Sequence, residues 1–465
     1  VCSSDLMRKS LEARVEKAWQ LPAGGLLLNA SHTHSGPEFR VGRVPADDDN
    51  YKPSSLGDSY GRDLEDKLFA LIGQALESRA PARLAYSSAR CGFAMNRRLP
   101  TKSGYANSPY PEGPVDQSVP VLRVEGADGK LLAVLFGYAC HNTTLALYQF
   151  SGDYAGYAQQ YFEADHPGVT ALFMLGCGGD QNPYPRGTVE LAQKHGRALA
   201  TAIEAALVTT LKAVNGPLRS AYGEIQIDYA PAPTREEFTA RLASKDKYEA
   251  AHAKRMLERL DKGEKLPTRY PYPVQVVRFG DVLTMVALGG EVVVDYSLRL
   301  KRELTGTAVW VAGYSNDVMG YIPSVRVLKE GGYEAGGAMR FSTTHPGPWA
   351  ESVEERIVVR VWCRRGDTLL LHRAASSARR LAGQHELPAA EHLGLTPDDA
   401  RRGAILAAKT RSITRYRIRE LIHTHPTSRV RPTEGLVWVP LAQLETITLS
   451  GPHRRWVREI GRAHV

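Results

Sequence analysis

Cysteine is scarce in this chain, and long hydrophobic runs are missing from it. Five cysteines are spread over 465 residues without a CxxC pair or a regular spacing, which argues against both a zinc ribbon and a disulfide scaffold. No window approaches the roughly twenty apolar residues that a membrane-spanning helix needs. With 43% hydrophobic residues, the chain can still bury a large core, and its length favours two or more domains.

Acidic residues are under-represented near the C-terminus. Residues 358–465 contain 19 Lys and Arg against 9 Asp and Glu, a net charge of 19 − 9 = +10, whereas the whole chain carries +9. The preceding part is therefore nearly neutral. Such asymmetry is typical of a nucleic-acid-binding module; the alternative is an arginine-rich surface that binds nothing.

Short apolar runs that end in polar or glycine-rich clusters recur along the first two-thirds of the chain. Runs of about four to eight apolar residues are typical of strands buried on both faces of a parallel sheet. Open α/β sheets bind ligands beyond the carboxyl ends of their strands, so the clusters that follow are candidates for a site. The five runs span residues 25–28, 131–138, 169–175, 282–288 and 308–312.

Helical patterns alternate with these runs. Residues 7–20, 64–78 and 188–208 favour helices, and residues 233–270, rich in Lys, Glu, Arg and Ala, favour a solvated helical excursion. This alternation predicts an α/β fold with a mainly parallel sheet flanked by helices. The composition changes near residues 353–360, where a second, smaller domain is expected to begin.

Four potential N or O ligands follow predicted strands. His32 comes two residues before His34, so if the strand persists both rings face one side, as a metal site requires. His141 follows the longest run, Glu291 is expected to open a helix after a Gly-Gly turn, and Tyr321 follows another strand. Each has an ordinary structural explanation alone, such as an acid at a helix N-terminus. Their coincidence at strand exits favours a shared site.

Eight short segments carry a family resemblance. In chain order they are Ser-His-Thr-His-Ser-Gly-Pro (31–37), Asn-Arg (96–97), Ala-Cys-His (139–141), Gly-Asp-Tyr-Ala-Gly-Tyr (152–157), Gly-Asp (179–180), Gly-Glu (290–291), Gly-Tyr (320–321) and Tyr-Glu-Ala (333–335). Residues 23–355 thereby resemble the catalytic domain of the neutral/alkaline non-lysosomal ceramidase family. The zinc ligands implied by the resemblance are His32, His141, Glu291 and Tyr321.

The resemblance also implies a reaction. Zinc lowers the pKa of a bound water toward ~7, and that water can attack an N-acyl carbonyl. The resemblance gives His34 and Tyr333 roles in proton transfer or oxyanion stabilisation, and Arg97 a role in holding a carboxylate or polar head group. Ordinary polar loop residues are the alternative. A sphingolipid-like substrate at a membrane surface, and an exported or periplasmic location for the full-length protein, follow from the same resemblance.

One motif departs from the family. Ceramidases carry Gly-Asp-Val-Ser-Pro-Asn where this chain has Gly-Asp-Gln-Asn-Pro-Tyr (179–184). The family serine is therefore Asn182, whose amide cannot act as a nucleophile but could donate a hydrogen bond to substrate. Asp180, in the same motif, is kept as a candidate catalytic residue. Metal-dependent hydrolysis still follows, whereas ceramide as the substrate does not.

Residues 357–458 resemble a second family, the Nudix-like domain in the C-terminal part of adenine DNA glycosylases. Strands are expected at residues 358–363 and 368–372, and the resemblance also rests on residues 381–388 and 436–441. The glutamate-rich helix that would bind Mg²⁺ is missing, because residues 401–412 contain no Glu. A small α+β binding domain is expected instead, and its basic charge suits a nucleic acid or nucleotide.

The two ends have the character of translated sequencing adapter, and we exclude residues 1–6 and 459–465 from the fold. The expected domains are then residues 7–355, incomplete at their start, and residues 356–458. A lipid hydrolase and a DNA-repair-like module share no compartment, so we expect a chimeric assembly. The alternative to a zinc amidohydrolase is a nucleic-acid-binding C-terminal module behind an inactive front domain.

Overall fold

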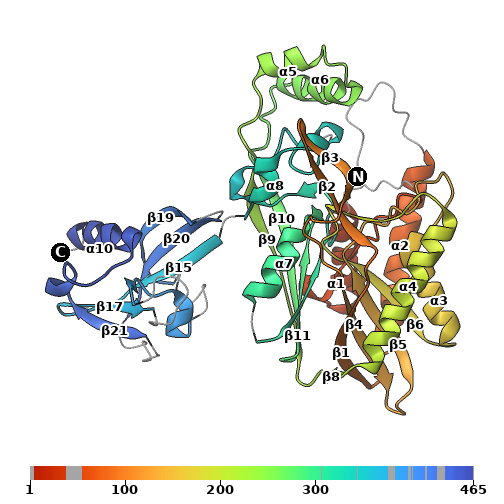
Figure 1. Ribbon diagram of the computed structural model, residues 1–465, viewed down its shortest axis with the longest axis horizontal. Helices are drawn as coiled ribbons and strands as arrows, with labels where there is room; N and C mark the ends of the chain where they lie inside the picture. Colours follow the sequence, from red (N-terminus) through yellow and green to blue (C-terminus); the bar gives the residue numbers. More distant parts are fainter. Residues whose placement is uncertain are drawn as a thin grey trace. The chain divides into compact units, whose positions relative to one another are not determined.

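The computed structural model describes residues 5–37, 55–304, 306–342, 344–354, 356–374, 383–395, 400, 402–413, 416–426 and 435–463 (Figure 1). The chain divides into two compact units, Val1–Val353 and Glu354–Val465. No helix within the described ranges is long and apolar enough to cross a membrane. The predictions for residues 1–4, 381–382, 401 and 464–465 lie outside these ranges.

The first unit contains a five-stranded sheet in the order β6-β5-β4-β1-β8. Helices α3 and α4 cover one of its faces (Figure 1), and side chains such as Phe136, Phe162 and Ile203 fill the space between them without solvent exposure. These elements are β1 (Ala82–Arg90), β4 (Ser118–Gly126), β5 (Leu131–Tyr138), α3 (Asp153–Asp165), β6 (Thr170–Leu175), α4 (Val189–Val208) and β8 (Lys212–Ala213).

A second sheet in the order β13-β11-β10-β9 packs against the first. Trp310 of β13 lies in one apolar cluster with Tyr86 of β1 and Leu122 of β4. Its ring comes so close to Gly137 of β5 that a Cβ there would lie 2.8 Å from it, so only glycine fits. The strands are β9 (Leu218–Asp228), β10 (Arg269–Phe279), β11 (Leu283–Leu288) and β13 (Ala308–Ala312).

The α/β class is confirmed, but the expectation of mainly parallel strands within the sheets is wrong. Only β5·β6 and β11·β13 are parallel in the two large sheets; their other pairings are antiparallel. Short turns at residues 127–130 and 280–282 join β4 to β5 and β10 to β11, and such connections allow only antiparallel pairing. Buried hydrophobic runs report burial on both faces, not strand direction.

The helices predicted at residues 7–20, 64–78 and 188–208 are confirmed. They correspond to α1 (Asp5–Trp19), the second part of α2 (Ser55–Glu77), and α4; the solvated excursion contains α5 (Arg235–Arg241) and α6 (Lys247–Asp261). Four of the five predicted strands are also present as β5, β6, β11 and β13. Residues 25–28 are not a strand, because a 3-10 turn at Ala23–Gly25 precedes them and only Asn29 forms an isolated bridge, to Ser315.

Short strands link the two sheets around the site. They form a β3-β2-β7 sheet and a parallel β12-β14 pair. Glu291 lies in β12 and not in a helix, since α7 begins three residues later. These elements are β2 (Ala94–Thr101), β3 (Gly104–Tyr110), β7 (Gln181–Pro183), β12 (Glu291–Val292), α7 (Val294–Glu303), β14 (Tyr321–Ile322) and α8 (Val325–Glu330).

The second unit is small and α+β. Its sheets have the orders β15-β20-β19 and β16-β17-β18, with β21 paired to β17, and Trp456 of α10 is buried against Leu371 and Ile422. Residues 405–413, which overlap the stretch (401–412) that lacks the glutamates of a Nudix helix, form strand β19. The elements are β15 (Arg356–Trp362), β16 (Arg364–Arg365), β17 (Thr368–Arg373), β18 (His385–Glu386), β19 (Ile405–Ile413), β20 (Tyr416–Thr424), β21 (Leu436–Pro440) and α10 (Gly451–Ala463).

Candidate functional site

The carboxyl ends of the parallel strands carry the site. His141 follows β5, and Glu291 follows β11 after a sharp turn at Gly290. Gly290 has φ +73°, and a Cβ there would lie 2.7 Å from the carbonyl oxygen of Gly320, so this turn requires glycine. Glu291 then pairs in register with Tyr321 across β12·β14, which places both residues on the same face of the ladder.

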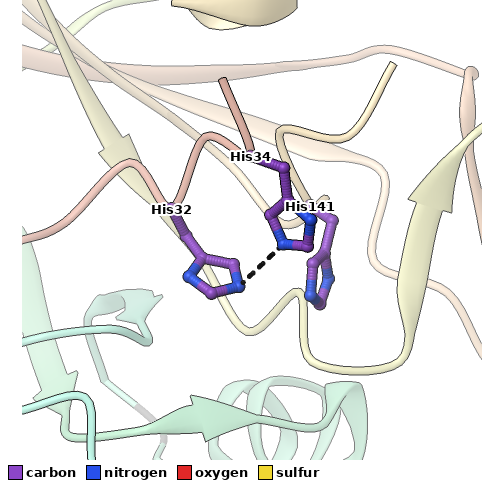
Figure 2. A group of neighbouring side chains, drawn as sticks. All are labelled: His32, His34 and His141. Atoms are coloured by element: carbon purple, nitrogen blue, oxygen red, sulfur yellow. Dashed lines mark hydrogen bonds between the residues drawn. The ribbon is translucent and has the colours of Figure 1, made fainter. Parts of the chain in front are cut away.

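Three histidines gather at this edge. The Nε2 atoms of His32 and His34 lie 3.4 Å apart, on one loop, and His141 faces them from another loop (Figure 2). One ring nitrogen from each of the three lies within 4.8 Å of the others. The expected persisting strand does not bring His32 and His34 together. His32 has φ +54°, so the chain is not extended there, and His34 and Ser35 lie in a turn.

Glu291 joins two of these histidines. Its Oε2 lies 3.2 Å from Nε2 of His32 and 3.2 Å from Nε2 of His141. Two donors bound tetrahedrally to zinc at about 2.0–2.2 Å are separated by about 3.3–3.6 Å. The separations around Glu291 are therefore close to those of a divalent cation's ligands.

The hydrogen bond of the second nitrogen of His141 fixes the ring's tautomer. Nδ1 lies 2.6 Å from the carbonyl oxygen of Gly178. A carbonyl can only accept, so Nδ1 carries the proton and Nε2 presents a lone pair to the Glu291 carboxylate. Arg97 Nη1, 3.4 Å from the same nitrogen, can donate only a long, weak hydrogen bond. Two acceptors at 3.2 Å require a proton or a cation between them.

The pKa values favour the cation. Burial, followed by the charge of Arg97, lowers the pKa of His141 to about 4, so the ring takes no second proton near neutral pH. Partial removal of the ring from water, followed by the charge of His32, lowers the pKa of His34 to about 4. Burial alone would raise the pKa of Glu291, but the two neighbouring imidazoles hold it well below its usual range. Neutral imidazoles and an ionised carboxylate are what a metal binds.

Arg97 organises the buried side of the site. Its guanidinium donates to the Tyr321 hydroxyl at 3.0 Å, to Asn182 Oδ1 at 3.2 Å and to Glu334 Oε1 at 2.9 Å. The Tyr333 ring packs on Tyr321 at 5.3 Å between centroids. Burial and the charge of Glu291 raise the pKa of Tyr321 well above its usual range, although Arg97 opposes them. Tyr321 therefore reaches the site as a phenol that accepts a hydrogen bond from Arg97.

Asn182 and Asp180 differ in their placement. Asn182 is buried and fully engaged: Oδ1 accepts from Arg97, and Nδ2 donates to Asn107 Oδ1 at 3.3 Å and to the Tyr184 hydroxyl at 3.4 Å. The Asp180 carboxylate accepts from the Val294 amide at 2.8 Å and from Asn96 Nδ2 at 3.1 Å. These hydrogen bonds tie Asp180 to the first residue of α7 and to β2; its catalytic role stays a prediction.

Two residues of the site were not singled out from the sequence. Glu334 binds Arg97, and its neighbour Arg98, through its two oxygens. Tyr314 is buried, has φ +50°, and packs on His32 and His141 at 5.0 and 6.0 Å between centroids. Glu334 lies inside a recognised motif, which was a usable signal. Tyr314 belongs to the cluster that follows the run at residues 308–312, so its only signal was its position after a predicted strand.

Solved structures with a similar fold exist. The crystal structure of neutral ceramidase from Pseudomonas aeruginosa matches with a TM-score of 0.54 at 20% identity, over 75% of this chain and 62% of that one. A ceramidase complexed with C2 matches with a TM-score of 0.55 at 19% identity, over 75% of this chain and 63% of that one. Most of this chain has a ceramidase-like fold. It spans a little under two-thirds of either ceramidase.

Sequence comparison adds no relative. No family model matches the chain, and no curated protein matches it. A Nudix hydrolase from M. Smegmatis, RenU, aligns with 25% of this chain and 92% of its own at 14% identity, with a TM-score of 0.17. A score this low does not show a shared fold, so the Nudix-like character of residues 357–458 stays a prediction.

Proposed function

We propose that the first unit is a zinc-dependent hydrolase of ceramidase type that cleaves an N-acyl amide bond. The observation that carries the proposal is the contact of His141 Nε2 with Glu291 Oε2 at 3.2 Å. Two acceptors at this distance need a proton or a cation between them, and the low pKa of His141 argues against the proton. The ceramidase-like fold supports it. His32, His141 and Glu291 would hold the metal, with Tyr321 beside them as a further oxygen.

The remaining residues have separate tasks in this reaction. Bound zinc supplies Lewis acidity and an acidic water. His34 is exposed and unprotonated near neutral pH, so it can take a proton from a reacting group that enters from solvent. Arg97 is buried and always charged, and it can stabilise negative charge that develops beside Tyr321. Tyr333 packs on the Tyr321 ring and lines the site beside it.

Asn182 bears on the route of hydrolysis. An amide offers no nucleophile, so no acyl-enzyme forms at this position, and hydrolysis proceeds by direct attack of water. A lipid with an amide-linked acyl chain, such as a sphingolipid-like molecule, is the substrate we propose. The nucleic-acid or nucleotide partner of residues 356–458 and the chimeric origin of the chain stay predictions; salt-dependent DNA binding would test the first.

Metal analysis combined with amide hydrolysis tests the proposal. We expect about one zinc per chain and hydrolysis of a short-chain N-acyl substrate that stops on chelation and returns with zinc. His141→Ala loses both. His195→Gln is the matched control, since His195 is also buried but its Nε2 meets the Pro185 carbonyl at 2.7 Å. A zinc-free wild type, or hydrolysis that survives His141→Ala, would sink the proposal.

A further inference from the structure

A short apolar segment beside the site is exposed. Between residues 147 and 150, Tyr148 is 111% exposed, Phe150 82% and Leu147 37%. Single exposed apolar residues are ordinary on a protein surface. Three in four consecutive positions, two of them large aromatics with almost no protein contact, form a patch that marks an interaction site.

The loop of the histidine cluster holds this segment. The Leu147 amide donates to Ser35 Oγ at 3.0 Å, the Ser151 amide donates to the Ser35 carbonyl at 2.8 Å, and Thr33 Oγ1 donates to the Ser151 carbonyl at 2.8 Å. Thr33 and Ser35 are the neighbours of His34. The apolar side chains are therefore displayed from a fixed backbone next to the exposed histidine of the site.

A cation lies near the same segment. The Gly187 amide donates to the Thr144 carbonyl at 2.8 Å, which brings the turn containing exposed Arg186 to the base of the segment. The Arg186 guanidinium lies 5.5 Å from the centroid of the Tyr184 ring. Aromatic side chains together with a basic one are typical of groups that anchor a protein in the head-group region of an anionic bilayer.

We propose that Leu147, Tyr148 and Phe150 insert into a lipid surface and so place the histidine cluster over lipid that carries the N-acyl bond. We infer membrane binding from the exposed residues alone. Only the role of this binding in N-acyl hydrolysis rests on the proposed function. The size of the patch favours a lipid over a protein. Three such side chains offer roughly 500 Å², less than the roughly 800 Å² that each partner of a stable protein complex buries, whereas a membrane anchor needs only a few inserted rings.

Vesicle co-sedimentation of the full chain tests the docking. We expect the wild type to bind phosphatidylcholine vesicles, and to bind more tightly when phosphatidylserine is added. Tyr148→Ser combined with Phe150→Ser lowers the partition coefficient by about tenfold or more, because two aromatic side chains no longer leave water. Leu172→Ser with Val208→Ser is the matched control: these residues are 50% and 84% exposed elsewhere in the first unit, and binding stays as in the wild type.

Two further measurements make each outcome decisive. Zinc content separates docking from the metal centre, since the docking variant keeps its metal and chelated wild type still binds vesicles. Sedimentation velocity tests for a second copy as the occupant. Vesicle binding equal in the docking variant and wild type, wild type that binds no vesicles, or a dimer lost only in the docking variant would each overturn the proposal.

Discussion

Arg97 Nε donates to Glu334 Oε1 at 2.9 Å, and both side chains are buried. The other oxygen of the same carboxylate accepts from Arg98. One acid thus pairs with two consecutive buried guanidiniums. Burial alone would raise its pKa, but the ionic attraction of Arg97 and Arg98 holds the pKa low. Glu334 acts on the site through Arg97 and is a positioning residue.

Glu334→Gln leaves the buried Arg97 guanidinium without its carboxylate and leaves Arg98 with Glu330 alone. Breaking a buried pair from one side costs about 3–5 kcal/mol, so the free energy of unfolding, measured in urea, should fall by at least about 3 kcal/mol. Glu330→Gln is the control, because Glu330 also binds Arg98, at 3.2 Å, but its side chain is 20% exposed. A loss of equal size in both variants contradicts the special role of Glu334.

Tyr314→Phe should stabilise the protein by about 1 kcal/mol. The Tyr314 hydroxyl is buried and has no hydrogen-bond partner among the residues that the structure describes, so removing it relieves a desolvation penalty. Tyr154 is equally buried, but its hydroxyl donates to the Cys140 carbonyl, and Tyr154→Phe should cost about 1 kcal/mol. In thermal unfolding, the melting temperature should rise in Tyr314→Phe and fall in Tyr154→Phe. A loss in Tyr314→Phe would mean that the hydroxyl has a partner.

Asp180 should make stability depend on pH. Burial raises its pKa to about 6, against 3.8 for the free group. The native state therefore binds a proton that the unfolded chain has released, and this contribution is fully present below about pH 3.8 and lost as pH rises through about 6. Asp180→Asn removes the dependence. The stability of the variant relative to wild type should rise by roughly 2–3 kcal/mol between pH 4 and 7; parallel curves contradict this.

Metal removal should lower stability if the cation joins three separate segments of the chain. Zinc at a hundredfold excess over its dissociation constant stabilises the native state by about 2.7 kcal/mol, so adding it to chelated protein raises the melting temperature. His141→Ala abolishes the increase, whereas His195→Gln preserves it. An increase of equal size in His141→Ala means that zinc binds elsewhere.

The hydrophobic pattern of the sequence predicted where helices and strands lie better than it predicted how the strands pair. The run at residues 308–312 is the observed strand β13, and α4 begins one residue after the predicted start, because apolar runs and caps are local signals. Strand direction depends on the connections, and the antiparallel β10·β11 pair follows from a three-residue turn that hydrophobicity does not report. Residues 25–28 are apolar without being a strand. Arg8 and Gln275 donate hydrogen bonds to the carbonyls of the adjoining turn at Ala23–Gly25, and the apolar run does not report these contacts.

The site was predictable where motifs lie at strand ends. His32, His141 and Glu291 converge, and Tyr321 pairs with Glu291 in register. Residues that act through others were not predictable, because a sequence does not show that Tyr314 lies against two histidines. Asp180 is expected in catalysis because it belongs to a motif; its carboxylate accepts from the Val294 amide, and its catalytic role stays a prediction.

X-ray absorption at the zinc K-edge of the purified full chain tests the central claim most directly. The account predicts one zinc per chain with only nitrogen and oxygen donors at about 2.0–2.2 Å, at least two of them imidazoles, and loss of the signal in His141→Ala. Sulfur donors at about 2.3 Å, or zinc retained in His141→Ala, would contradict a cation held between His141 and Glu291.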